Sequence, residues 1–300
     1  MSHPSITGWT RAYYLAPHGM VGVALVGASW LVSWMHVEPV GRHAFFPLWL
    51  GYILIVDAVV LRRSRTSLLT RSPGRFAGMF IAAAPLWWSF EAINSLTHNW
   101  RYVGTEQYSA IEYALLASLS FSTVIPAVFE TAELVGTFGF IQRFRHWPSV
   151  RLSLPAHIAA VAMGALSILM LTVWPRYLFP LSWLGLFIVL DPINHMLGRP
   201  SIVGWLERGD WRLPIALALG AFVCGGFWEM WNYWAFPKWV YSVPMVDFAH
   251  VFEMPALGYG GYLPFGLEVY AGYHFLAGSL GSRRPIIRLS NHELADAGTG

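Results

Sequence analysis

Residues 224–241 read CGGFWEMWNYWAFPKWVY, and residues 85–103 read PLWWSFEAINSLTHNWRYV. Each stretch places an acid and an amide three positions apart, and therefore on one face of a helix, among tryptophans and ahead of a Trp-x-Tyr sequence. The corresponding residues are Glu229 and Glu91, Asn232 and Asn94, Trp239 and Trp100, and Tyr241 and Tyr102. We therefore expect the chain to be built from an internal repeat.

The same correspondence continues on both sides of these stretches. FFPLWLGYILIVDAVV (45–60) matches LFPLSWLGLFIVLDPIN (178–194). The interval from Glu91 to Glu130 is 39 positions, and so is that from Glu229 to Glu268. The further corresponding pairs are His18 and His157, Asp57 and Asp191, Glu112 and Glu253, Pro126 and Pro264, and Glu130 and Glu268. The expected repeat thus covers most of the chain.

The composition is that of a helical membrane protein. Of the 300 residues, 56% are hydrophobic and only 12% are charged, about half the charged fraction of a soluble domain. The 16 Trp, 19 Phe and 13 Tyr residues are typical of a chain with many side chains at membrane interfaces. A helix needs about 20 apolar residues to cross a bilayer. The segments that approach or exceed this length are 17–36, 45–62, 77–97, 108–140, 153–174, 178–198, 213–235 and 248–280.

These observations predict an all-α integral membrane protein with about eight transmembrane helices, arranged as two tandem four-helix repeats. Because each repeat has an even number of spans, the repeats have parallel orientation and are related by an axis near the membrane normal. The predicted boundaries are residues 1–145 and 146–282 for the two repeats, and 283–300 for a polar cytoplasmic tail. The fourth and eighth segments are long and contain proline, so we expect a kink or a re-entrant portion in each.

The basic residues set the predicted orientation. With eight spans, 15 of the 19 Lys and Arg residues fall on the side of the two termini, and the others are Arg42, Arg101, Arg176 and Lys238. Because cytoplasmic loops are rich in Lys and Arg, we expect both termini in the cytoplasm and the chain in the cell inner (plasma) membrane. The single Cys224 excludes an intrachain disulfide. Nothing in the sequence indicates nucleic-acid binding.

Acids within membrane segments are the candidate functional groups, because a carboxylate in a bilayer is costly unless it is protonated, paired or hydrated. A protonated acid beside aromatic rings can donate a proton to an alkene, and the rings can stabilise the resulting carbocation. The second half carries more reactive residue types than the first. The candidate catalytic residues are Glu229, Glu253, Asn232, Glu268 and Asp191, and the candidate substrate-binding residues are Trp228, Trp231, Trp239, Tyr241, His195 and His250.

Three of these residues are expected to converge. Glu229 and Asn232 share a helix face, and Glu253 begins the eighth segment after a loop of modest length. Glu229 or Glu253 would then be the general acid, with Asn232 and Tyr241 orienting it. The structural alternative is that these polar groups only join helices, while the Trp and Tyr residues form an interfacial belt.

Histidines allow two further interpretations. His250 and Glu253 have the i, i+3 spacing of two metal ligands on one helix face, and His195, His274 and Asp191 would be further ligands. The sequence contains no HExxH or multi-histidine motif, however. His18 and His157 would be candidate axial haem ligands, but histidines at helix starts are more commonly hydrogen-bonded structural residues. We therefore expect no metal and no cofactor.

The residues DPIN, GRPS, GGFWEMWNYW, KWVY and FEMPALGYGGYLPFGLE, all within 178–275, resemble an uncharacterised family of bacterial multi-pass membrane proteins. More loosely, the chain is similar to the heterodimer-type lycopene cyclases and other small integral-membrane terpene cyclases. Those proteins are compact, have paired acidic motifs within membrane helices and use acid catalysis without a redox reaction. Their Pro-x-Glu-Glu/Asp motif differs from Pro264-Phe-Gly-Leu-Glu268 and Pro126-Ala-Val-Phe-Glu130 in this chain.

The leading functional hypothesis is an inner-membrane enzyme, a cyclase or hydratase, that protonates an isoprenoid-type lipophilic substrate. One alternative is a proton-linked small-molecule transporter, in which the two repeats rock about a central site lined by the same acids. Another is a non-catalytic subunit that binds pigment or lipid within a larger membrane complex. A cavity open sideways to lipid favours the enzyme, whereas a water-filled path from both faces favours the transporter.

Overall fold

Five helical segments are long and apolar enough to cross a membrane, within residues 15–289 that the computed structural model describes. They are α3 (Phe45–Ser64), α5 (Pro73–Thr97), the Ala110–Gly136 segment, the Pro175–Met196 segment and α12 (Arg212–Tyr233). The chain is therefore a predominantly helical, membrane-embedded protein. This confirms the class that its composition predicts.

The three other predicted segments are also helical. α2 covers Pro17–Trp34, α8 covers Leu154–Met170 and α13 covers Tyr262–Ser279, and the longest of them has 18 residues. At 1.5 Å per residue, such a helix is about 27 Å long, slightly less than a hydrocarbon thickness of about 30 Å. Eight crossings therefore stay a prediction, as do the tandem repeats.

The predicted 108–140 segment consists of two helices, α6 (Ala110–Phe121) and α7 (Val124–Gly136). They separate at Ser122 and Thr123, whose hydroxyl groups donate hydrogen bonds to the backbone carbonyls three residues earlier. Pro126 lies in the first turn of α7, where its missing N–H leaves no helical hydrogen bond unmade. The expected break is thus present, just ahead of the proline.

The predicted 248–280 segment is helical only from Tyr262. Its first part forms the short strands β3 (His250–Val251) and β4 (Met254–Pro255), which pair antiparallel, and then the 3₁₀ helix η4 (Ala256–Gly261). Proline has no backbone N–H to donate, and glycine weakens a helix through its conformational freedom. The expectation that Glu253 begins a membrane helix is therefore wrong, because this residue lies in the turn between the two strands.

Shorter elements connect the long helices. The strands are β1 (Trp100–Val103) and β2 (Lys238–Tyr241). The short connecting helices are α4 (Leu68–Arg71) and α11 (Ile202–Glu207), whereas α9 (Pro175–Leu178) and α10 (Gly185–Met196) are parts of the apolar Pro175–Met196 segment. The remaining 3₁₀ turns are η1 (Gly41–His43), η2 (Gly139–Phe144) and η3 (Phe179–Trp183).

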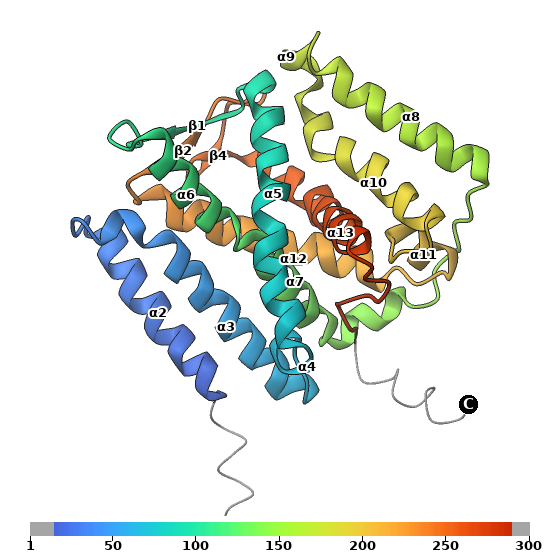
Figure 1. Ribbon diagram of the computed structural model, residues 1–300, viewed down its shortest axis with the longest axis horizontal. Coiled ribbons are helices and arrows are strands. Elements are labelled where there is room, and N and C mark those ends of the chain that lie inside the picture. The colour runs from blue at the N-terminus through green and yellow to red at the C-terminus, as the bar shows by residue number, and fades with distance from the viewer. Residues whose placement is uncertain (1–14, 290–300) are drawn as a thin grey trace, which may run out of the picture.

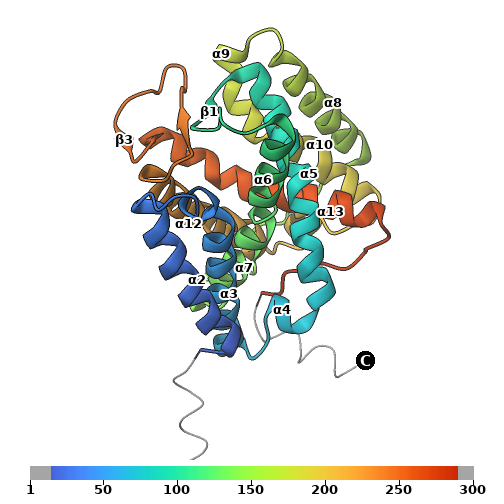
Figure 2. The same ribbon diagram turned by 60° about the vertical axis from the view of Figure 1, so that its left-hand side comes forward.

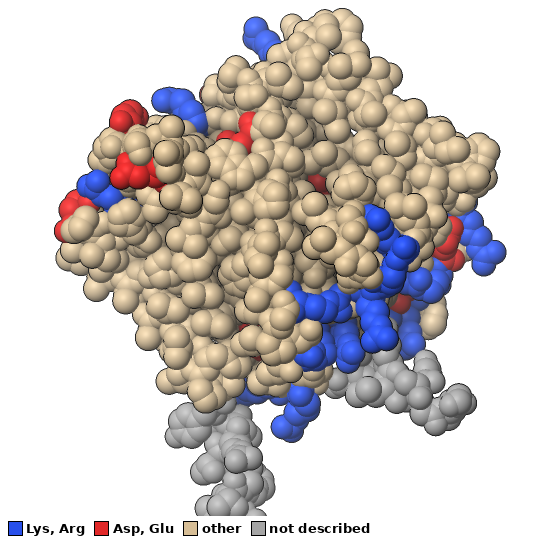
Figure 3. All heavy atoms as spheres, viewed as in Figure 1, with Lys and Arg blue, Asp and Glu red and all other residues tan. Residues whose placement is uncertain are grey.

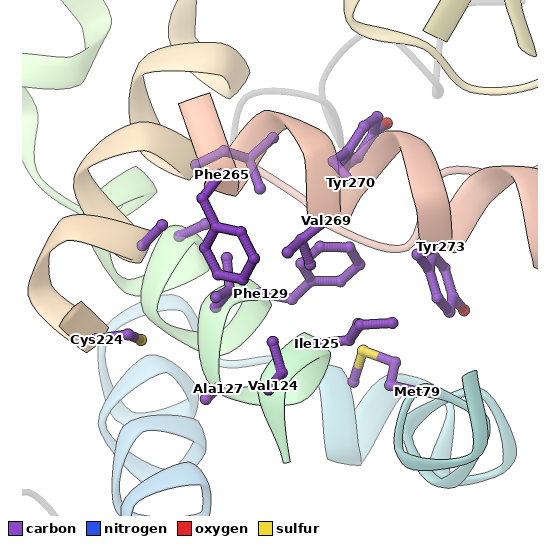
Figure 4. Packing of buried hydrophobic residues seen from close by; sticks show 14 of the residues in the cluster. Met79, Val124, Ile125, Ala127, Phe129, Cys224, Phe265, Val269, Tyr270 and Tyr273 are labelled. Carbon is purple, nitrogen blue, oxygen red and sulfur yellow. The ribbon is translucent and has the colours of Figure 1, made fainter. Parts of the chain in front are cut away.

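α7, α12 and α13 pack together in the middle of the molecule, with α2 and α3 on one side and α8 and α10 on the other (Figures 1 and 2). Figure 4 shows the core at this crossing, where Ile125 and Phe129 of α7 face Val269 and Tyr273 of α13. The backbones of α12 and α7 approach closely at Gly220, since a Cβ there would lie 2.8 Å from the backbone N of Ala132. Small residues permit such contacts between membrane helices.

The two ends of the helices differ in charge. Figure 3 shows Lys and Arg side chains gathered at one end of the visible face, beside a broad belt that is mostly free of charged residues. Basic side chains link different elements at this end: Arg63 bonds to Thr137, Arg199 to Ser279 and Arg212 to Gln142. The opposite end carries the β1–β2 and β3–β4 pairs (Figure 1).

The first part of the predicted polar tail, residues 283–289, packs against the helices. Ile286, Ile287 and Leu289 are buried, and Arg71 and Arg75 donate hydrogen bonds to backbone carbonyls of this segment. Apolar residues in an otherwise basic segment explain why it packs against the helices. The rest of the predicted tail, 290–300, lies outside the described residues, as does the predicted cytoplasmic segment that contains Arg11.

Gly220→Ala tests the close contact between α12 and α7. The added methyl group meets the backbone of Ala132, and overpacking of this kind costs about 1–3 kcal/mol. Gly226 in the same helix would meet no atom within 4 Å, so Gly226→Ala is a matched control that stays neutral or stabilises by up to about 1 kcal/mol. We expect only Gly220→Ala to lower the midpoint of thermal unfolding in detergent, followed by tryptophan fluorescence. Equal midpoints for the two variants would contradict the packing.

Candidate functional site

A cavity of about 480 Å³ lies at the end of the molecule that carries β1 and β2. This volume is within the range of small-molecule sites, about 300–1,000 Å³. Its walls come from α5, α6, η3, α12, η4 and α13 together with both strands. The lining is rich in aromatic side chains, which are Phe45, Trp87, Trp100, Tyr102, Tyr108, Tyr113, Phe121, Phe179, Trp183, Trp228, Trp239, Tyr241, Tyr262 and Phe265. Such walls favour a lipophilic ligand.

The antiparallel pairing of β1 with β2 forms one wall. Trp100 lies opposite Tyr241, and Tyr102 lies opposite Trp239. The tryptophan of each strand therefore lies opposite the tyrosine of the other strand, so the two strands are equivalent in this pairing. All four side chains line the cavity.

Two buried asparagines attach these strands to the helices that precede them. Asn232 Nδ2 donates to the backbone carbonyl of Trp239 at 2.7 Å, and its Oδ1 accepts from the N–H of the same residue at 2.9 Å. Asn94 makes the same two bonds to Trp100, at 2.8 and 3.2 Å. The side-chain amide thus satisfies backbone groups that would otherwise be unpaired. Both groups of the Asn232 amide are engaged here, so its expected role of orienting Glu229 has no contact to support it among the described residues.

Glu229 is fully buried behind the cavity wall. Its Oε1 accepts hydrogen bonds from the hydroxyl groups of Tyr241 at 2.7 Å and Tyr262 at 2.6 Å. Its Oε2 has no hydrogen-bond partner among the described residues. These two tyrosines link the carboxyl group to the cavity, whose described lining residues include no Asp or Glu.

Glu91 occupies the corresponding place behind β1. Its Oε1 accepts from Tyr102 at 2.6 Å, from the indole N–H of Trp87 at 2.9 Å and from that of Trp100 at 3.2 Å. Glu229 thus pairs with Tyr241 as Glu91 pairs with Tyr102. The two acids differ in exposure, since Glu91 is only partly buried.

The two strand tyrosines are neutral donors at physiological pH. Desolvation first, and then the neighbouring Glu229 carboxyl, raise the pKa of Tyr241 well above its usual value. The pKa of Tyr102 is raised by the same two causes, with Glu91 as the neighbouring acid. Each hydroxyl therefore keeps its proton and holds it against a carboxyl oxygen.

The charged side chains of the wall are paired. Lys238 forms an ion pair with Glu253, and Arg42 forms one with Glu38. Glu253 is thus placed beside Lys238, and the expected hydrogen-bonded cluster of Glu229, Asn232 and Glu253 is not among the described contacts. Because these pairs neutralise the two cations, the described residues of the wall offer no free charge to a charged ligand.

One cavity residue, Asn99, carries a buried side-chain amide whose nitrogen and oxygen atoms have no hydrogen-bond partner among the described residues. Buried polar groups in proteins are nearly always hydrogen-bonded to protein, water or ligand. These atoms can anchor one polar group of an otherwise apolar molecule.

The other predicted residues lie elsewhere. Trp228 lines the cavity, but Trp231 packs against Trp49 and Trp30 in the contact between α12 and the α2–α3 pair. His250 is exposed and bonds to Asp247. Glu268 is buried in α13, where its Oε1 accepts from the N–H of Leu186 at 3.0 Å.

Asp191 has a structural role. Its carboxyl oxygens accept from the N–H groups of Ile202 at 2.7 Å and Val203 at 2.9 Å, and it thereby caps the start of α11. Asp57 serves α4 similarly, through the Ser67 hydroxyl and the N–H of Leu69. Unpaired N–H groups at a helix start are suited to an acid. Asp191 lies outside the cavity wall.

Tyr262 and Trp183 are cavity residues that sequence reasoning does not single out. Tyr262 ends the GYGGY run, and Trp183 belongs to the η3 turn. Both resemble ordinary interfacial aromatics in the sequence, so nothing distinguishes them before the fold is known. The chain matches no protein-family model, no curated protein sequence and no solved structure.

Proposed function

We propose that the protein is an integral-membrane enzyme that binds a lipophilic, isoprenoid-type molecule in the aromatic cavity and protonates it, as a cyclase or hydratase. The observation that carries this proposal is the hydrogen bonding of cavity tyrosines Tyr241 and Tyr262 to the buried Glu229 carboxyl. The aromatic wall and the paired cations favour an uncharged substrate. The unpaired Asn99 amide favours a substrate with a polar group at one end.

The proton reaches the substrate through a tyrosine. With Glu229 protonated, the hydrogen bond of Tyr241 or Tyr262 reverses direction: the tyrosine hydroxyl gives its proton to one carbon of a C=C bond while it takes a proton from Glu229. The other carbon becomes a carbocation, which the surrounding indole and phenol rings stabilise. In a cyclase a second C=C bond attacks this cation and a proton is then lost; in a hydratase water adds and loses a proton. That proton returns along the same path, and Glu229 is neutral again.

A non-catalytic lipid- or pigment-binding protein is the second candidate. It is favoured by the placement of Glu229 behind the wall, where two tyrosine bonds also join α12, β2 and α13. Both candidates require the cavity to be occupied, and only the enzyme requires a titratable group at position 229. Binding and proton transfer can therefore be tested separately.

We further propose eight membrane crossings in two tandem four-helix repeats of parallel orientation. Three contacts recur in both halves and support this arrangement. A tyrosine hydroxyl donates to a glutamate, an asparagine amide bonds to the backbone of a tryptophan, and an aspartate accepts from N–H groups at the start of a short helix. The β1–β2 register adds to this support, because Trp100–Tyr241 and Tyr102–Trp239 exchange under a two-fold rotation. The gathering of basic side chains at one end supports an inner-membrane protein with that end, and both termini, in the cytoplasm.

Filling the cavity tests the binding step. Ala117 of α6 lines the cavity, whereas Leu115 of the same helix is 67% exposed. We expect tag-purified wild-type protein to carry an isoprenoid-type lipid detectable by mass spectrometry of its organic extract. Ala117→Trp should reduce that lipid at least fivefold, and the control Leu115→Trp should retain it. Equal lipid in the two variants would show that the cavity is not the binding site.

Glu229→Gln tests the proton-transfer step. The amide keeps the size of the carboxyl group but removes the titratable proton, and loss of a general acid typically slows turnover by about 10²–10⁴-fold. Lipid extracts of expressing cells should lose the product and accumulate its precursor with this variant. Glu112→Gln is the control, because that exposed acid bonds only to Ser109 among the described residues. Unchanged product with Glu229→Gln, but loss of bound lipid with Ala117→Trp, would identify the binding protein instead.

Cysteine labelling tests the orientation. Ser149 is exposed at the basic end and Ser242 is exposed beside β2, while the native Cys224 is buried and gives no background. We expect an impermeant thiol reagent to label Ser242→Cys in intact spheroplasts and to label Ser149→Cys only after permeabilisation. The reverse pattern would place the termini outside the cell, and labelling of both in intact spheroplasts would contradict a membrane between them.

A further inference from the structure

A second cluster of reactive side chains lies outside the aromatic cavity. His157 of α8, His195 of α10 and Glu207 at the end of α11 each offer one ligand atom, and these atoms lie within 4.8 Å of one another. Three helices thus converge on one point. Leu184 of the cavity wall precedes His195 by 11 residues, so the cluster lies about 16 Å away along α10.

The geometry around His195 suits a metal ion. Its Nε2 lies 3.4 Å from Glu207 Oε1, and its Nδ1 lies 3.2 Å from the hydroxyl group of Ser201. A tetrahedral ion with ligand bonds of about 2.0–2.1 Å holds its ligand atoms about 3.3–3.4 Å apart. A hydrogen bond from the second ring nitrogen is also usual for a metal-bound histidine, because it fixes the ring orientation.

His157 supplies an independent observation. The residue is only 4% exposed, and its Nδ1 has no hydrogen-bond partner among the described residues. Its ring centroid lies 4.9 Å from that of His195. An unpaired buried ring nitrogen is costly, and a shared metal ion would satisfy it.

Among its described residues, the first half of the chain lacks this arrangement. His18, the counterpart of His157, lies 3.0 Å from Asp57, and Leu61 stands near the position that corresponds to His195. In the second half, Asp191 is bound by the backbone of α11, and among the described contacts His157 has no such acid partner. His18 therefore provides an internal control for the site formed by His157 and His195.

We propose that His157, His195 and Glu207 bind one divalent transition metal ion, Zn²⁺ or Fe²⁺, with solvent at the remaining coordination positions. Two imidazoles and one carboxylate suit both ions. The side chains of His195 and Glu207 are 25% and 30% exposed, which leaves an entry path from the basic end. The ion ties α8, α10 and α11 together. This proposal differs from the sequence-based expectation of no metal site, and it is independent of the chemistry proposed for the cavity.

Measuring the metal content of the purified protein tests the proposal directly. Full-length protein purified without a histidine tag is treated with a chelator, loaded with Zn²⁺ or, without oxygen, with Fe²⁺, and desalted. Elemental analysis should find about one ion per chain, and the arm that retains its ion identifies the metal. His195→Ala and Glu207→Gln should each retain less than a fifth of that amount, and the control His18→Ala should retain all of it.

Two results would overturn the site. One is wild-type protein with no more metal than His195→Ala, and the other is equal loss from His18→Ala. Size-exclusion profiles in detergent verify folding, and Glu207→Gln keeps the test usable if a histidine variant aggregates, because Glu207 is partly exposed. Wild-type protein should also unfold at a higher temperature with the ion than without it, a shift absent from Glu207→Gln.

Discussion

The pairing of β1 with β2 joins the ends of α5 and α12 and closes the cavity between them. A short strand near a membrane needs a partner for every N–H and C=O that water does not reach. Here the strands satisfy each other on one side, and the amides of Asn94 and Asn232 satisfy the remaining groups of Trp100 and Trp239. The orientation of the wall tryptophans and tyrosines depends on these bonds, and so does the position of each tyrosine hydroxyl against its acid.

Buried polar groups elsewhere in the chain obey the same requirement. The carboxyl groups of Asp57 and Asp191 accept hydrogen bonds from N–H groups in the first turns of α4 and α11. These N–H groups have no partner within their own helix. Such acids contribute to the structure rather than to chemistry. Glu229 differs from them because its partners are side chains of a cavity wall, and an arrangement of that kind can exchange a proton with a ligand.

The membrane class and most helix positions were predictable from the sequence, because the apolar composition and the lengths of the apolar segments can be read directly from it. The matching of Glu229 with Glu91 also anticipated a recurring contact that the structure contains. The partners of Glu253 and Asn232 were not predictable. The pairing of Glu253 with Lys238 depends on Pro255 and the glycines that follow it, because these residues convert a predicted helix into a hairpin. The contacts of Asn232 are with the backbone of Trp239, and backbone groups carry no sequence signal. The His157, His195 and Glu207 cluster was missed because its members lie on three separate helices and have no local motif.

The packed segment 283–289 has a consequence for the order of assembly. It follows all the described helices in the chain, yet the N–H of Arg288 donates to Glu133 and the carbonyl of Ile286 accepts from Arg71, both in the first half. All the described helices are therefore synthesised before the basic end of the first helical group has its complete set of partners. Insertion of the early helices has to precede their final packing, and the completed C-terminal segment fastens the first half only after the second half is in place.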